Sequence, residues 1–148
     1  HKRRFLFTLL QGKPLLARNC HLFMPITFKE AASIWGLAME TKNLTELEML
    51  MCDDSFSWDS INGGSSSSKQ DTLNWVRTTD FRIGNYKELY NGDGVICGTH
   101  SVLEPGKDET FVMCVIELSA DGSKVGRWSI TRANKYNNST QAHLGFFL

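Results

Sequence analysis

The chain has 148 residues, of which 41% are hydrophobic and 22% are charged, and its 16 basic residues balance its 16 acidic ones. This length corresponds to one domain, and the charge balance excludes a protein that binds DNA without sequence preference through massed Lys and Arg. The longest apolar run, residues 5–10, is far shorter than the roughly 18 residues that cross a bilayer, so we expect no membrane partner.

The sequence begins at His1 rather than Met, so we expect residues 1–148 to be a single domain from a longer protein. Four cysteines are too few for a secreted disulfide scaffold, which favours an intracellular, cytoplasmic location. No Cys-x-x-Cys pair occurs, and we therefore predict neither a metal site nor a cofactor.

Residues 3–23 contain two apolar runs separated by Gly12-Lys13-Pro14. Gly and Pro this close together mark a turn, which favours an N-terminal β-hairpin. A short helix over residues 5–10 is the alternative, because apolar runs of this length do not distinguish a helix from a strand.

Two helices are predicted next. Glu30 follows Thr27 by three residues, the spacing of a capping box, and residues 28–40 then carry apolar side chains spaced for one helical stripe. Asn43 and Glu46 repeat the capping pattern before a shorter helix. Because the connection is only a few residues long, we expect an antiparallel helical hairpin.

Residues 63–68 read Gly-Gly-Ser-Ser-Ser-Ser, a composition typical of a flexible tether or an engineered replacement for a longer loop. Residues 75–83 form either a strand or a short helix. Short runs rich in β-branched and aromatic residues, separated by turn signals such as Asn91-Gly92-Asp93-Gly94 and Asp121-Gly122, predict strands over residues 95–102, 110–119, 126–131 and 143–148.

Together these elements predict an α+β fold, in which an antiparallel-rich mixed β-sheet packs against the helical hairpin and an N-terminal β-hairpin precedes both. The common nucleotide-binding, hydrolase and metalloprotease motifs are absent from the sequence, so we do not expect an enzyme. A catalytic dyad of His100 with Cys97 or Asp93 is an alternative, but no local motif supports such a pair.

A spacing of aromatic residues suggests a family. Phe7 and Gln11, followed by Phe23, resemble the aromatic, Gln and second aromatic of the C-terminal cap-binding domain of bunyavirus-type L polymerases, and the strand entry after Tyr90 is similar. The resemblance implies binding of the 7-methylguanosine cap of host mRNA, for cap-snatching transcription by a segmented negative-strand RNA virus polymerase. Its partners would be capped RNA and the remainder of the viral polymerase, in the host cytoplasm.

The resemblance also implies roles for individual residues. Phe7 and Phe23 would sandwich the positively charged methylated ring, with Gln11 beside it, and in this family Tyr is common where Phe23 stands. Trp58 and Trp75 are alternative stacking platforms.

An acidic side chain would accept hydrogen bonds from the guanine edge, and Asp71, Asp80 and Glu88 are all open for that role. The alternative to cap binding is a non-enzymatic protein-protein interaction module, which requires an exposed apolar patch instead of an aromatic sandwich.

Overall fold

The computed structural model describes residues 25–132, which form three helices and six strands. In chain order these are α1 (Phe28–Thr41), α2 (Thr45–Leu50), β1 (Ser57–Ser60), β2 (Ser65–Ser68), α3 (Lys69–Thr78), β3 (Arg82–Gly92), β4 (Val95–Leu103), β5 (Thr110–Leu118) and β6 (Val125–Arg132). Among residues 25–132, no helix is long and apolar enough to cross a membrane.

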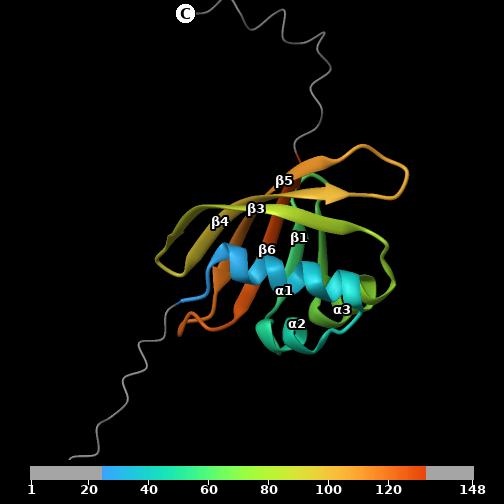
Figure 1. Ribbon diagram of the computed structural model, residues 1–148. Coiled ribbons are helices and arrows are strands. Elements are labelled where there is room, and N and C mark those ends of the chain that lie inside the picture. The colour runs from blue at the N-terminus through green and yellow to red at the C-terminus, as the bar shows by residue number, and fades with distance from the viewer. Residues whose placement is uncertain (1–24, 133–148) are drawn as a thin grey trace, which may run out of the picture.

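The strands form one sheet in the order β2-β1-β6-β5-β4-β3 (Figure 1). All neighbouring pairs are antiparallel except β1 and β6, which are parallel and lie far apart in the sequence. The predicted α+β class with a mixed, mostly antiparallel sheet is therefore confirmed. The predicted N-terminal β-hairpin and the strand at 143–148 lie outside the described residues.

The predicted capping box is present at the start of α1. The Thr27 side chain accepts a hydrogen bond from the Glu30 amide, and the Glu30 carboxylate accepts one from the Thr27 amide at 2.8 Å. The second predicted capping box, between Asn43 and Glu46, is wrong. Asn43 instead accepts from the Thr45 amide, two residues on, and Leu44 occupies the cap position without a side-chain bond. The two predicted helices are confirmed as α1 and α2.

The Gly/Ser segment is partly a strand and not a flexible tether. Ser65–Ser68 form the edge strand β2, paired antiparallel with β1. Ser68 then caps α3 by accepting a hydrogen bond from the Asp71 amide. Residues 75–83 divide between the end of α3 and the start of β3, so a single element over that range is also wrong.

The predicted turns lie where expected between strands. Asp93 and Gly94 both have positive φ, 53° and 77°, at the tight β3–β4 connection, and Gly122 has φ 73° between β5 and β6. These conformations suit Gly and Asp, so the local sequence determines these two hairpins.

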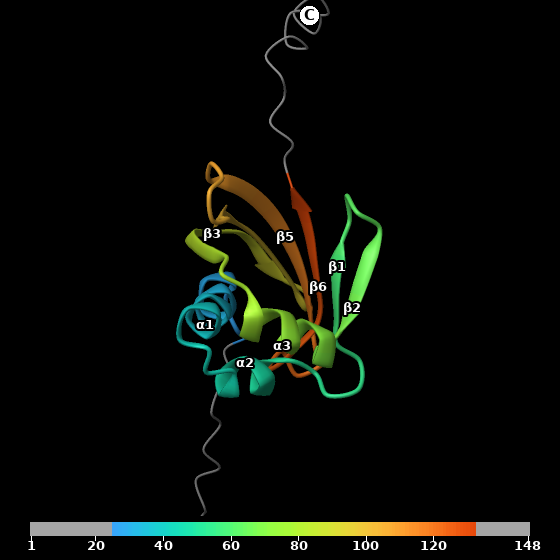
Figure 2. The ribbon, with the colours of Figure 1, turned by 90° about the vertical axis from the view of Figure 1, so that its right-hand side faces the viewer.

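The helices cover the inner face of a curved sheet (Figure 2). Phe28 of α1 is fully buried, and its ring lies directly over Gly98 of β4. A Cβ built at Gly98 would stand 2.3 Å from that ring, so the missing side chain lets α1 approach the sheet. Phe28 also contacts the ring of Trp128 on β6, with ring centroids 6.3 Å apart.

Candidate ligand-binding site

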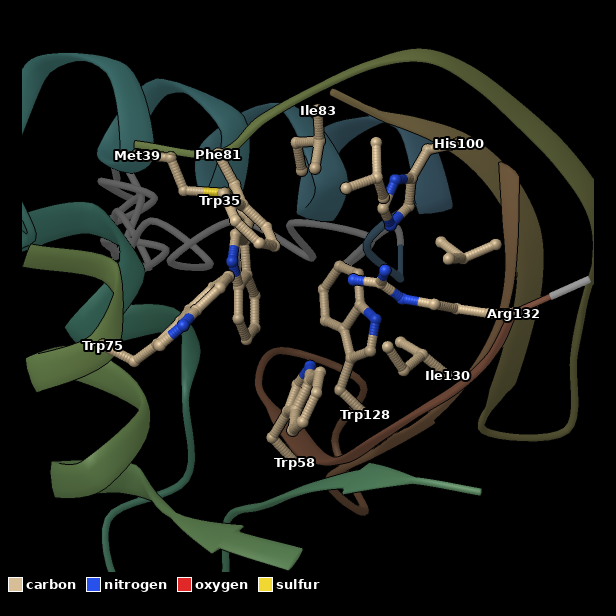
Figure 3. Close-up of a pocket in the computed structure, with 12 residues that line it drawn as sticks. Trp35, Met39, Trp58, Trp75, Phe81, Ile83, His100, Trp128, Ile130 and Arg132 are labelled. Carbon is tan, nitrogen blue, oxygen red and sulfur yellow. The ribbon is translucent and has the colours of Figure 1, made fainter. Parts of the chain in front are cut away.

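A cavity lies between α1, α3 and the inner face of the sheet, and all four tryptophans of the sequence line it (Figure 3). The space inside it that a water-sized sphere can occupy is about 70 Å³, and the empty space is about 500 Å³ when open solvent at its mouth is included. The lining residues are Trp35, Met39, Trp58, Trp75, Phe81, Ile83, His100, Val102, Val112, Trp128, Ile130 and Arg132.

Each tryptophan comes from a different element. Trp35 and Met39 are four residues apart in α1 and therefore share a helix face. Trp128 on β6 pairs in register with Trp58 on the parallel strand β1, so both side chains project from the same face of the sheet. Trp75 reaches the cavity from α3.

Two of the tryptophan rings stack on each other at the cavity. The rings of Trp58 and Trp75 are nearly parallel, at 24°, with centroids 6.5 Å apart. Trp75 is 43% exposed, and its ring also makes an edge contact with Phe81.

The opposite wall of the cavity carries its polar groups. His100 on β4, Val112 on β5 and Arg132 on β6 form one row of register partners, and all three line the cavity. His100 is buried, and its Nδ1 lies 3.0 Å from the Ser101 carbonyl oxygen. Burial and the positive charge of Arg132 lower the pKa of His100, although the hydrogen bond to Ser101 opposes them. The imidazole is therefore neutral at pH 7, with its proton on Nδ1.

The residues predicted for ligand binding divide into three groups. Trp75 lines the cavity, as its role as a stacking platform requires. Asp80 and Glu88 do not line it: Asp80 is exposed between α3 and β3, and Glu88 accepts a hydrogen bond from the Phe28 amide at 2.7 Å, at the start of α1. Phe7, Gln11 and Phe23 lie outside the described residues.

The imagined dyads of His100 are wrong. Side chains alternate along β4, so Cys97 projects from the opposite face of the sheet to His100, and Asp93 lies beyond the far end of the strand. Burial raises the pKa of the Cys114 thiol to about 12, so this cysteine behaves as a core residue and not as a nucleophile. No cluster of His, Cys, Asp or Glu suited to a metal ion occurs within residues 25–132.

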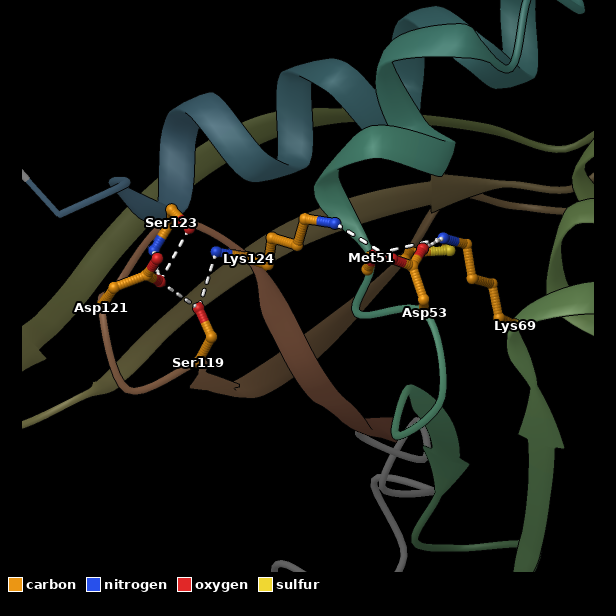
Figure 4. A network of polar contacts seen from close by, with 7 residues as sticks. All are labelled: Met51, Asp53, Lys69, Ser119, Asp121, Ser123 and Lys124. Carbon is orange, nitrogen blue, oxygen red and sulfur yellow. Dashed lines mark hydrogen bonds and ion pairs between the residues drawn. The ribbon is translucent and has the colours of Figure 1, made fainter.

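A second group of polar residues lies at the other end of β6 (Figure 4). Asp53 accepts a hydrogen bond from Lys69 at 2.8 Å and forms an ion pair with Lys124 at 3.5 Å. The hydrogen bond from Lys69 and the charge of Lys124 lower the pKa of Asp53. Both cations are paired with this one carboxylate, so the group fastens the segment before β1 to α3 and to the start of β6.

Solved structures share this arrangement of helices over a curved sheet. An NTF-2 like protein of Burkholderia xenovorans LB400 matches with a TM-score of 0.54 and 12% identity, over 77% of this chain and 91% of that one. The chain has the NTF2-like fold. An LEH-like epoxide hydrolase of M. tuberculosis matches with TM-score 0.54 and 13% identity, over 70% of this chain and 80% of its own.

A further structure with the NTF2-like fold is a protein of Catenulispora acidiphila described as having a ketosteroid isomerase-like fold, in complex with trimethylamine. It matches with TM-score 0.53 and 13% identity, over 70% of this chain and 85% of that one. No family model matches the sequence, and no curated protein matches it either.

The NTF2-like fold overturns the resemblance to a viral cap-binding domain. A helical hairpin followed by an antiparallel sheet occurs in unrelated α+β folds, and a short spacing of aromatic residues does not distinguish between them. Sequence reasoning also missed Trp35, Trp128, His100 and Arg132 as lining residues. The alternation Trp128, Ile130, Arg132 along one strand was the available signal that these side chains share a face.

Proposed function

We propose that the chain binds a small, ring-containing apolar molecule in the tryptophan-lined cavity. The observation that carries the proposal is the gathering of all four tryptophans of the sequence around one space. Trp35 and Trp128 are buried, whereas Trp75, whose ring is nearly parallel to that of Trp58, is 43% exposed and can be reached from solvent. Aromatic walls with few polar groups are typical of small-molecule sites.

The descriptions of the structural neighbours agree with a ligand of this size. One is named as a hydrolase of epoxides and another holds trimethylamine, and both are small organic molecules. No carboxylate lines the cavity among the described residues, and His100 is its one titratable group near neutral pH. We therefore propose a binding protein, and that the chain is not an enzyme stays a prediction.

The test uses N-phenyl-1-naphthylamine, an uncharged probe whose fluorescence rises in apolar sites. We expect saturable binding that the Trp75→Leu variant weakens by roughly fivefold to tenfold, the effect of losing one stacking partner worth about 1 kcal/mol. The matched control is Phe111→Leu, another half-exposed aromatic that lies outside the cavity. Absence of saturable binding, or equal loss in both variants, would contradict the proposal.

Cap recognition also stays a prediction. The rings of Trp58 and Trp75 are nearly parallel, as a sandwich needs, but neither Asp80 nor Glu88 lines the cavity to read guanine. A calorimetric titration with 7-methyl-GDP, with GDP as the control, tests it directly. At least tenfold preference for the methylated ligand would support cap binding, and equal or absent binding would exclude it for this chain.

The protein-protein interaction module is the remaining prediction, and one feature favours it. Phe111 and Met113 alternate on the outward face of β5, and they are 52% and 47% exposed. A second copy of the chain is the occupant that we would test first, by sedimentation of the native chain and of the Phe111→Ser variant. A concentration-dependent dimer that the variant abolishes would support this interpretation, and a monomer at all concentrations would contradict it.

A further inference from the structure

We propose that the ligand of this cavity carries a carboxylate, which Arg132 binds at the cavity mouth while the apolar rings of the ligand lie against the tryptophans. This inference rests on the proposed function and adds the chemical class of the ligand. It is carried by the position of Arg132 and by the absence of an acidic partner for its guanidinium within residues 25–132.

Arg132 is placed toward the cavity by the alternation of β6. Trp128, Ile130 and Arg132 are two residues apart and share the inner face, and all three line the cavity. Its backbone is held in place because its amide donates to the Asn62 side chain at 2.7 Å. The side chain extends inward from β6 toward His100 and Trp128 (Figure 3). It is exposed to solvent at the mouth, where an incoming ligand can reach it.

Among the residues that the structure describes, the guanidinium of Arg132 has no carboxylate partner. Within residues 25–132, no ion pair involves Arg132, and the remainder of the sequence contains no Asp or Glu at all. Arg127 on the same strand is the opposite case. It projects from the outer face and pairs with Asp59 at 3.2 Å and Glu117 at 3.4 Å. The charge that faces the cavity is therefore the uncompensated one.

The rest of the cavity wall does not neutralise this charge. His100, in the same row of register partners, is neutral because burial of its ring and the positive charge of Arg132 lower its pKa. The other lining side chains carry no charge. A cationic ligand would meet an unpaired Arg, whereas a carboxylate would accept two parallel hydrogen bonds from it.

The experiment compares three probes of the same shape by calorimetry at about 150 mM salt, where charges beyond about 8 Å are screened. These are 2-naphthoate (anionic), 2-naphthamide (neutral) and 2-naphthylmethylammonium (cationic). We expect the native chain to bind 2-naphthoate at least tenfold more tightly than 2-naphthamide, and the ammonium most weakly. Arg132→Gln should reduce the preference for the anion to within twofold, while Arg127→Gln leaves it unchanged.

The amide probe separates failure of this inference from failure of the proposed function. Equal binding of 2-naphthoate and 2-naphthamide by the native chain would overturn the carboxylate assignment and leave the apolar site standing. Tighter binding of 2-naphthylmethylammonium than of 2-naphthoate would also overturn it. The same holds if Arg132→Gln and Arg127→Gln lose the preference for 2-naphthoate equally. If neither 2-naphthamide nor N-phenyl-1-naphthylamine binds, the proposed function itself fails. Unchanged 2-naphthamide binding in Arg132→Gln shows that this variant is folded.

Discussion

Replacing Gly98 with Ala tests how α1 is seated on the sheet. The new Cβ would stand 2.3–2.5 Å from three atoms of the buried Phe28 ring, and contacts below 3.0 Å force a shift. Overpacking of this kind costs about 1–3 kcal/mol. Because Ala lowers the conformational entropy of the unfolded chain relative to Gly, the substitution also stabilises the folded chain by about 0.4–1 kcal/mol. We therefore expect Gly98→Ala to lower the free energy of unfolding by about 1–2 kcal/mol.

Urea unfolding followed by far-UV circular dichroism measures this change, and the sheet offers a matched control. At Gly126 a Cβ would meet only the Glu117 carbonyl oxygen, at an ordinary 3.6 Å. Gly126→Ala should therefore leave the stability unchanged or raise it slightly. In the same assay, combining Gly98→Ala with Phe28→Leu should cost at least about 0.5 kcal/mol less than the sum of the two single changes, because the smaller side chain relieves the clash.

The reasoning is refuted if Gly98→Ala is as stable as Gly126→Ala, or if the double variant is strictly additive. The effect should also reach the cavity, since Phe28 contacts Trp128 and Trp128 lines it. A shift of the Phe28 ring would then change the near-UV circular dichroism of the tryptophans in Gly98→Ala but not in Gly126→Ala.

Two further predictions concern pH. The lowered pKa of His100 means that the unfolded chain binds its proton more readily, so stability should decline as the pH falls below the ordinary value of 6.5 toward the folded pKa. An NMR titration of the His100 ring should give a midpoint below 6.5, and His100→Gln should remove this part of the decline; a midpoint at or above 6.5 contradicts it. Hydrogen bonds from the Ser119 side chain and from the side chain and backbone of Ser123 lower the pKa of Asp121 to about 2. The stabilisation that these hydrogen bonds give the folded chain is complete above pH 3.8 and is lost as the pH falls through about 2. The difference in urea midpoint between the native chain and Asp121→Asn should therefore shrink between pH 5 and pH 2. A constant difference would contradict this prediction.

The sequence by itself determined the elements whose signals are local. The capping box of Thr27 and Glu30 and the turns at Asp93-Gly94 and Asp121-Gly122 involve residues no more than three positions apart, so the conformational preference of a few residues decides them. The strands β4, β5 and β6 were also predicted within about two residues, because their β-branched and aromatic runs are bounded by such turns.

Composition did not predict the strands β1 and β2, whose positions depend on pairing with β6. Ser65–Ser68 have no intrinsic preference for a strand, and their backbone groups pair because β1 lies beside them. β1 is itself placed by its parallel pairing with β6, about 70 residues further along the chain. No local sequence pattern predicts a pairing between strands that are so far apart in the chain.

The cavity is likewise a product of tertiary structure. The stripe that includes Trp35 marked one buried helix face, and Trp58 and Trp75 were foreseen as stacking platforms, but their meeting with Trp128 depends on how α1, α3, β1 and β6 come together. Sheet register alone sets Arg132 in the row of His100, facing inward without a carboxylate, while Arg127 faces outward and is paired. Residue types suggested which side chains could stack or carry charge, and only the packing of distant elements decided which of them share one space.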